Sequence, residues 1–344
     1  MPKPTLQAGG VVVRILSAHI PAFTHKVLSG ELGYMLPELP FTPGTSAIGV
    51  VESVADDVFG VEVGQTVFCD PLMAVPTQDG SSNSILIAWT GLGADSAQLQ
   101  NIWKDGVWAE KALWPAVCLT PIPNSLADTP HALAALGYLA IPYGGFLRGQ
   151  LRPGQQVIIS GATGGLGSAA VLVALAMGAA RVIAVGRNQT VLEQLKQLDL
   201  QRVVGVALTG DVEADQATLL KLAGGSDLML DTLGGIKHPQ PTLSCIRALR
   251  PGGTAVLMGG VQADIPLPYG EIMLKQISIC GAFMYPRTAP QELLQMVQGG
   301  SLRLDHIQRQ TFLLSEIEDA IAHAAASKGL DYTILTTVNA AQPD

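Results

Sequence analysis

Hydrophobic positions in the first third of the chain follow a strand-like pattern. Short runs of β-branched residues, such as residues 11–16 and 48–54, are bounded by glycine and proline and predict β-strands. Residues 71–96 are rich in Pro, Gly and Ser and are expected to form irregular connections. The pattern therefore predicts a β-rich module over residues 1–127.

From residue 128 onward, apolar strands alternate with helices. A first helix is expected to begin at Thr129-Pro130, with threonine as N-cap, and to run to about residue 149 with a kink at Pro142. Six short apolar segments follow, most of them separated by amphipathic or apolar helical stretches. The expected strands are residues 155–160, 181–186, 203–208, 227–234, 254–260 and 277–284. This alternation predicts right-handed βαβ units around a buried parallel sheet, and six strands match the dinucleotide-binding fold.

The alternation stops after residue 286. A helix over residues 290–300 is followed by a strand, a second helix and a closing strand that begins at Tyr332. This tail most simply returns to the first module. We therefore expect a Rossmann doubly wound α/β domain over residues 128–286 and a discontinuous β-rich domain made of residues 1–127 and 287–344.

Composition narrows the class of protein. The 344 residues suit two domains, and a content of 48% hydrophobic residues excludes a disordered chain. A net charge of −8 without a Lys/Arg block argues against nucleic acid as a partner. Residues 153–180 carry no charge, but their proline and clustered glycines favour strand, turn and helix in series over a membrane span. We expect no membrane partner.

Cysteine usage and the N-terminus indicate the compartment. The four cysteines lie far apart without a C-x-x-C pair, which argues against a disulfide framework and a zinc knuckle. The first ten residues contain no apolar signal core. We expect a cytoplasmic protein.

The strongest chemical signal is the turn Gly161-Ala-Thr-Gly-Gly-Leu-Gly167, between a predicted strand and a predicted helix. It does not match G-x-G-x-x-G strictly, but it stands in the context that this motif requires. Glycines allow a pyrophosphate to approach the backbone, and a helix N-terminus favours its charge. Thr163, Gly164, Gly165 and Leu166 are the predicted contacts; a tight turn without ligand is the alternative.

A second signal follows the next strand, which ends Val185-Gly186-Arg187-Asn188. NAD-binding folds place a carboxylate here to hold the ribose hydroxyls, and this chain has none. Gly186, Arg187 and Asn188 are predicted to accept a 2′-phosphate. Charge-assisted bonds of roughly 1.5–3 kcal/mol would favour NADPH about ten- to hundredfold. A solvated surface arginine is the alternative.

Several segments together resemble the medium-chain dehydrogenase/reductase superfamily, specifically its zinc-free, quinone-oxidoreductase-like branch. They are GATGGLGSAAV, GRN, RPGGTAVLMGG and GAFMYPR, with LPFTPGTSAIGVVESVADDVFGVEVGQTVF in the first module. The resemblance spans residues 11–338, without the family's usual first hairpin. It implies a GroES-like catalytic domain, NADPH as cofactor, and a quinone or α,β-unsaturated carbonyl as substrate. It also implies further cofactor contacts from Leu233, Met258, Gly259, Met284 and Tyr285.

The resemblance also bears on zinc. Zinc-dependent members have a cysteine ligand in the segment that matches Ser17-Ala18-His19-Ile20, where this chain offers only His19. Their Gly-His-Glu reads Gly44-Thr45-Ser46 here, the third ligand position falls near Leu136-Gly137, and the four-cysteine lobe is missing. A catalytic zinc needs about three protein ligands. We therefore expect no metal.

Without a metal, an electron-poor acceptor can take a hydride at carbon, and a proton follows from a side chain or water. His19 and Tyr143 are the predicted proton donors, and Tyr285 is expected to border the nicotinamide. Each could instead have a purely structural role. Four tryptophans of the first module, Trp89, Trp103, Trp108 and Trp114, are expected in the core, where one or two could line a substrate wall.

Two alternatives share the scaffold: a zinc-free alcohol or aldehyde oxidoreductase, and a catalytically silent NADPH-binding sensor. Two others fail. A short-chain dehydrogenase would place the glycine turn near the N-terminus and carry Tyr-x-x-x-Lys, and an esterase would carry G-x-S-x-G. Residues 277–284 would form an unprotected apolar sheet edge, as in related dimers, so a homodimer is expected.

Overall fold

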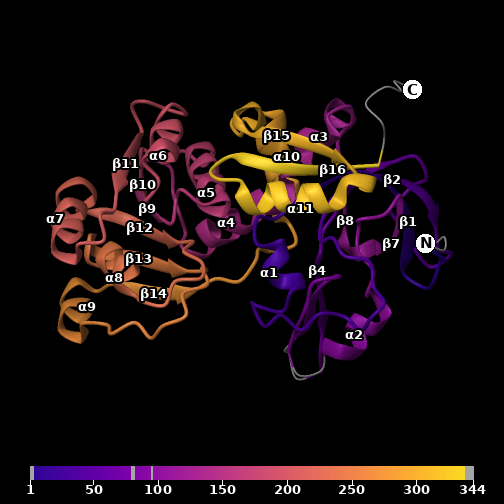
Figure 1. The fold of residues 1–344 in the computed structure, drawn as a ribbon, viewed down its shortest axis with the longest axis horizontal. Coiled ribbons are helices and arrows are strands. Elements are labelled where there is room, and N and C mark those ends of the chain that lie inside the picture. The colour runs from indigo at the N-terminus through magenta and orange to yellow at the C-terminus, as the bar shows by residue number, and fades with distance from the viewer. Residues whose placement is uncertain (1–3, 79–81, 94–95, 338–344) are drawn as a thin grey trace. The chain divides into compact units, whose positions relative to one another are not determined.

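The computed structural model describes residues 4–78, 82–93 and 96–337. The chain divides into two compact units (Figure 1). The first unit holds the described residues up to Gly137, Ile307–Ser327 and those from Asp331 on; the second holds Tyr138–His306 and Lys328–Leu330. The fold class is confirmed as a Rossmann-type α/β unit together with a discontinuous β-rich unit.

The first unit is built on a seven-stranded sheet. Its order is β15-β16-β1-β2-β3-β8, with β7 paired to β1. The strands are β1 (Gly10–Ile20), β2 (Ala47–Val54), β3 (Thr66–Cys69), β7 (Lys111–Pro115), β8 (Leu119–Pro121), β15 (Gln308–Leu313) and β16 (Asp331–Thr336). Apolar side chains from both ends of the chain, including Ile15 and Leu335, share one core. The pairing of β1 with β16 brings the C-terminal segment into the first unit.

The segment that was expected to be irregular forms a second, smaller sheet. Its antiparallel strands are β4 (Leu72–Pro76), β5 (Ser82–Leu86) and β6 (Thr90–Leu92). The prediction was wrong because it rested on Pro, Gly and Ser content, whereas Met73, Ile85 and Leu86 are buried and stabilise the strands by packing. Short helices complete the unit: α1 (Thr24–Leu28), α2 (Ser96–Ile102), α3 (Pro130–Leu133) and α11 (Ile317–Ala326), with 3-10 turns η1 (Ala116–Cys118), η2 (Asn124–Leu126) and η4 (Leu314–Glu316).

The second unit contains a six-stranded parallel sheet in the order β11-β10-β9-β12-β13-β14. The strands are β9 (Gln156–Ser160), β10 (Arg181–Gly186), β11 (Val203–Ala207), β12 (Ser226–Asp231), β13 (Leu249–Leu257) and β14 (Ser278–Gly281). The helices are α4 (Leu136–Arg148, which begins in the first unit), α5 (Gly165–Ala176), α6 (Gln189–Lys196), α7 (Val212–Ala223), α8 (Gln240–Arg247), α9 (Tyr269–Lys275) and α10 (Ala289–Gln298), with the 3-10 turn η3 (Leu304–His306). All six predicted strands are present, and the order reverses between β9 and β12 as in doubly wound folds.

Alternate side chains of each strand point to opposite faces of this sheet. On one face, Ile158 and Met229 join a cluster with Leu219 of α7 and Cys245 of α8. On the other, Leu230 of β12 lies against α4, where a Cβ at Gly145 would approach its side chain closely. Both faces are therefore covered, which explains why the strands read as unbroken apolar runs.

The predicted boundaries differ from those of the units at two places. Residues 128–137 belong to the first unit because α3 packs on β1, where Nδ1 of His131 lies 3.1 Å from Oγ of Ser17. Residues 287–306 belong to the second because α10 buries Leu293 and Leu294 there. Helical periodicity alone does not show which core a helix joins.

Two local predictions need correction. The helix expected from Thr129 is split into α3 and α4, and the Thr129 hydroxyl donates to the carbonyl of Leu126 instead of capping α3. The segment Arg250–Gly253, expected as a turn before the strand, lies within β13 as an irregularity: Ser226 pairs with Leu249 and Leu228 with Thr254. Gly252, at φ +73°, allows this bulge.

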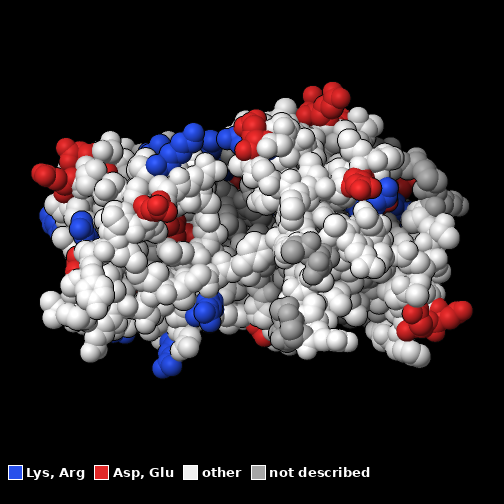
Figure 2. Space-filling view, turned by 90° about the horizontal axis from the view of Figure 1, so that it is seen from below, with Lys and Arg blue, Asp and Glu red and all other residues white. Residues whose placement is uncertain are grey.

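Charge is sparse on the surface that Figure 2 shows, in keeping with a charged-residue content of 14%. Across the described residues, none of the helices has the length and apolar character that a bilayer crossing requires.

Candidate cofactor and catalytic site

The glycine-rich turn joins β9 directly to α5. Gly161 adopts φ +82°, a conformation that favours glycine. A Cβ at Gly167 would overlap the carbonyl oxygen of Gly161, so α5 can approach the turn this closely only with glycine at residue 167. The two outer glycines therefore fix the backbone, and the residues between them are the ones left to meet a ligand.

The N-terminus of α5 suits an anion. Gly164 is its N-cap and offers no side-chain cap, and the first turn of the helix contains no acidic residue. A Cβ at Gly164 would meet only the Gly161 carbonyl, at 3.5 Å, so space remains beside the backbone. Together with the helix dipole, these features fit a dinucleotide pyrophosphate. Thr163, Gly164, Gly165 and Leu166 would hold it.

Tyr138 also lies at this turn, and sequence reasoning missed it. Its hydroxyl accepts a hydrogen bond from the backbone N–H of Leu166, and its ring would lie about 3.2 Å from a Cβ at Gly165. Burial raises the pKa of the Tyr138 hydroxyl, so this group stays protonated. No local sequence signal marks the residue, because α4 and α5 meet only in the folded unit.

The end of β10 lies against the same turn. A Cβ at Gly186 would overlap the Thr163 side chain, so glycine permits this contact. The next residue, Arg187, is exposed. Asn188 accepts a hydrogen bond from the backbone N–H of Val191 at 3.2 Å and so caps α6. Its amide oxygen is thus engaged, which leaves Arg187 and the Asn188 amide NH₂ as potential donors to a 2′-phosphate.

Leu233 and Gly259, predicted as cofactor contacts, come together beyond the ends of β12 and β13. The Gly260 N–H donates to the Leu233 carbonyl at 2.6 Å, and a Cβ at Gly259 would overlap that carbonyl. Buried Asp231 orders the first of these turns by accepting from the Leu233 N–H at 2.9 Å and from the Thr242 hydroxyl at 2.6 Å. Desolvation raises the pKa of Asp231. Its carboxylate supports the loop and was not predicted.

The remaining predicted contacts lie along α4. Because Gly144 has no side chain, the backbone of Met284 and Tyr285 can pack directly against it. Gly145 allows the same close contact with the thioether of Met258. Met284 has φ +52°, which is uncommon for a residue with a side chain. Tyr285 is buried. These residues therefore adjoin one helix, at the carboxyl ends of β13 and β14, where open parallel sheets bind ligands.

Tyr143, a predicted proton donor, lies on the same helix. Its hydroxyl donates to Oε2 of Glu292 on α10 at 2.6 Å. Desolvation and the Glu292 carboxylate both raise the pKa of Tyr143, so its proton is retained at neutral pH. The hydroxyl is thus already oriented by a half-buried carboxylate, a partner that sequence reasoning missed because 149 positions separate the two residues.

His19, the other predicted donor, lies in the first unit on β1, opposite Ile334 of β16. Its ring is 4% exposed, and its centroid lies 4.9 Å from that of Tyr332. Burial lowers the pKa of His19 to about 3, so the imidazole is neutral at physiological pH. A neutral, enclosed imidazole is a weak candidate for a proton donor.

Comparison with known proteins identifies the family. Residues 7–124 match the alcohol dehydrogenase GroES-like domain, and residues 165–299 match the zinc-binding dehydrogenase domain. An alcohol dehydrogenase of Moraxella sp. (strain TAE123) is 30% identical over 300 residues, covering 87% of this chain and 84% of the relative. The chain belongs to the medium-chain dehydrogenase/reductase superfamily. It is an NAD(P)-dependent oxidoreductase of that superfamily.

Two further proteins show how varied such relatives are. An acryloyl-coenzyme A reductase of Sulfurisphaera tokodaii is 28% identical over 314 residues, covering 88% of this chain and 85% of the relative. A solved structure from Sinorhizobium meliloti 1021, described as a zinc-binding dehydrogenase bound to NADP, shares the fold with a TM-score of 0.81 and 22% identity, covering 98% and 94% of the two chains. Membership of the superfamily does not fix the substrate.

The donor set of this medium-chain dehydrogenase/reductase does not fit a catalytic zinc. Of the residues at the expected ligand positions, His19 is packed against Tyr332, Ser17 contacts His131, and Ser46 lies beside Gly137. Hydroxyl groups are poor substitutes for the Cys, His and carboxylate ligands that zinc prefers. Across residues 4–78, 82–93 and 96–337, no three His, Cys, Asp or Glu side chains gather into a metal-binding group.

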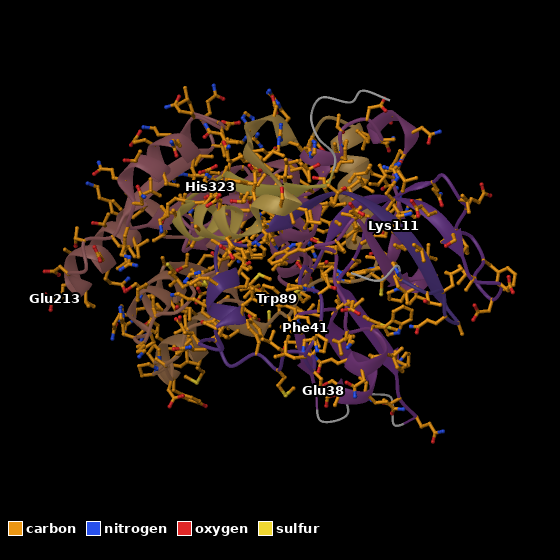
Figure 3. All side chains as sticks on the ribbon, turned by 45° about the vertical axis from the view of Figure 1, so that its right-hand side comes forward. Glu38, Phe41, Trp89, Lys111, Glu213 and His323 are labelled. Carbon is orange, nitrogen blue, oxygen red and sulfur yellow. The ribbon has the colours of Figure 1, made fainter. Side chains whose placement is uncertain are left out.

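The predicted tryptophan cluster lies in the first unit, where all four rings are buried. Trp89, labelled in Figure 3, contacts two aromatic residues from the segment after β1: its ring centroid lies 6.3 Å from that of Phe23 and 6.5 Å from that of Tyr34. Trp114 donates from Nε1 to the Asp70 carbonyl at 3.0 Å. Core packing accounts for Trp114, whereas the Phe23–Trp89–Tyr34 group presents a partly exposed aromatic surface.

Proposed function

We propose that the chain is an NADPH-dependent, zinc-independent reductase that acts on a quinone or an α,β-unsaturated carbonyl. The observation that carries this proposal is the uncapped N-terminus of α5, with exposed Arg187 after the neighbouring strand. The same arrangement favours NADPH over NADH, because no carboxylate stands in the Val185–Asn188 segment to repel a 2′-phosphate.

Bound NADPH would supply a hydride to the electron-poor carbon of the acceptor. The chain's own residues would hold the cofactor at the α5 N-terminus and provide the proton that completes the reduction. We assign that proton to Tyr143: its O–H, which donates to Glu292 at 2.6 Å, would turn from that carboxylate to the acceptor before the proton is transferred. After transfer, Glu292, which is half-buried, provides a route for the proton to be replaced from solvent.

The substrate class is supported by the donor set and by one relative. Without zinc, a simple ketone has no strong electrophile to polarise its oxygen, whereas a conjugated acceptor already has a low barrier to hydride addition at carbon. The acryloyl-coenzyme A reductase is named for such a conjugated substrate. The Moraxella relative favours the second candidate, a zinc-independent alcohol or aldehyde oxidoreductase.

The test is NADPH oxidation by the metal-stripped protein with quinones, enones, aldehydes and ketones. Turnover of quinones or enones is expected, unchanged when zinc is added. Turnover of aldehydes and ketones alone would replace the proposal with the alcohol oxidoreductase. Tight NADPH binding without turnover would indicate the sensor, which the internal contacts of His19 and Tyr143 would also suit.

We further propose a homodimer formed through β14. Within the described part of the chain this strand pairs with β13 alone and so leaves a free edge. Exposed apolar side chains precede and follow it, namely Leu267, Tyr269, Met273, Leu274 and Phe283. Light scattering should give twice the mass of 35.9 kDa. Leu274→Glu should favour the monomer while Leu200→Glu, at another exposed leucine, should not; a monomeric wild type would refute the dimer.

A further inference from the structure

A short turn near the C-terminus reaches the cofactor-binding region. Lys328–Leu330 belong to the second unit, although Ser327 and Asp331 on either side belong to the first. The Gly329 N–H donates to the Thr163 carbonyl at 3.3 Å. The chain therefore returns, more than 160 positions later, to the turn that is proposed to bind the pyrophosphate.

Gly329 fits tightly against two helices. It adopts φ +63°, and a Cβ there would lie 3.0 Å from Cγ1 of Val191 and 3.8 Å from Oγ of Ser168. Ser168 belongs to the first turns of α5. Val191 lies at the start of α6, where its backbone N–H donates to the side chain of Asn188. Residue 329 is therefore held beside the N-terminal ends of both helices.

These contacts connect the turn with the segment that carries Arg187. Thr163, which accepts from Gly329, also packs its side chain on Gly186, immediately before Arg187. The turn is thus linked through Thr163 to the segment that carries Arg187, whereas Tyr138 contacts the loop at Gly165 and Leu166.

Lys328 precedes Gly329 and is exposed. Among the described residues it makes no ion pair, and the first turns of α5 and α6 contain no carboxylate that would compete for it. The side chain of a lysine is long and flexible, and Gly329, the next residue, lies against Val191 at the start of α6. An unpaired cation is thus held at a site where Arg187 is already exposed.

We propose that Lys328 is a second cation that binds the 2′-phosphate of NADPH, together with Arg187. This inference rests on the proposed preference for NADPH. Two cations that approach one phosphate from segments far apart in sequence would set cofactor choice more strongly than Arg187 alone, because each can donate a charge-assisted hydrogen bond. Lys328 is a binding and specificity residue with no part in the chemical step.

The test uses two ligands that differ only in the 2′-phosphate: ADP-ribose and 2′-phospho-ADP-ribose. Calorimetric titration compares the wild type with Lys328→Gln and with Lys221→Gln, a control at an exposed lysine on α7. Lys328→Gln should weaken 2′-phospho-ADP-ribose about tenfold and leave ADP-ribose unchanged. It should also reduce the salt dependence of 2′-phospho-ADP-ribose binding, and Lys221→Gln should change neither affinity.

The other outcomes are distinct. An equal loss for both ligands would place Lys328 on the pyrophosphate and overturn the inference, as would no loss for either. If the wild type binds both ligands equally, the proposed NADPH preference itself fails. If the wild type prefers 2′-phospho-ADP-ribose and Lys328→Gln retains the full preference, only the role of Lys328 fails. Unfolding temperatures measured without ligand show whether Lys328→Gln is folded.

Discussion

The glycine-rich turn of the second unit and His19 of the first carry their chemical groups in different ways. At the turn, the proposed binding group is the backbone at the start of α5, and glycines at residues 161 and 167 fix its position. At residue 19, the group is a side chain, and the fold has buried it against Tyr332. Backbone function depends on local conformation and can be read from sequence, whereas side-chain function depends on partners that sequence does not show.

The sharpest test of the backbone region is Gly167→Ala. A Cβ at this position would overlap the Gly161 carbonyl oxygen, a backbone atom that cannot rotate away. We expect a loss of about 2–3 kcal/mol in unfolding free energy and no detectable NADPH binding. Thermal unfolding and fluorescence titration measure the two effects.

The matched control is Gly270→Ala. This glycine lies in α9, and a Cβ there would meet nothing within 4 Å. It should leave stability equal or slightly raised, since alanine favours helix. If Gly167→Ala behaves like this control and still binds NADPH, the close approach of α5 to the turn is not what builds the site.

Tyr143→Phe tests a side chain that lies beside the proposed cofactor site and whose hydroxyl donates a hydrogen bond to Glu292. If the hydroxyl supplies the proton, kcat should fall roughly a hundredfold, with the Kd for NADPH unchanged. Glu292→Gln keeps a hydrogen-bonding partner and should reduce kcat less. Full activity of Tyr143→Phe would make the pair a packing contact between α4 and α10.

Arg187→Ala is expected to have a smaller effect, confined to affinity. Removal of the guanidinium should weaken NADPH roughly ten- to hundredfold and leave NADH unchanged, so the gap between the two cofactors narrows. Calorimetry with both cofactors measures it, with Arg181→Ala as a control in the first residue of β10. An unchanged preference would mean that Arg187 is a solvated surface residue.

The contrast between local backbone conformation and long-range side-chain contacts explains which features the sequence could predict. The six strands of the second unit follow from apolar runs, and Leu233 and Gly259 meet because both lie beyond the carboxyl ends of adjacent parallel strands. Tyr138 and Glu292 were missed because their partners lie on other helices. The sheet of β4–β6 was missed because burial of residues such as Ile85 outweighs turn-forming composition.

His19 gives the smallest predicted effect, and it concerns stability rather than activity. Its pKa is about 3 in the folded protein, against 6.5 for a free histidine, because burial disfavours the cation. Above pH 6.5 both states are neutral at this group. As the pH falls from 6.5 toward 3, only the unfolded chain gains the proton, so the folded state loses roughly 1 kcal/mol per pH unit.

Urea unfolding of wild type and His19→Asn at pH 7 and pH 5.5 measures this loss. The wild type should lose more stability between these pH values than the variant, because asparagine does not titrate. His25→Asn, at an exposed position of α1, should keep the wild-type loss. The comparison uses the difference in unfolding free energy between the two pH values, so a destabilisation by the substitution that is the same at both pH values cancels. An equal loss in wild type and His19→Asn would mean that His19 takes up its proton without unfolding, and its side chain would then be available for proton transfer.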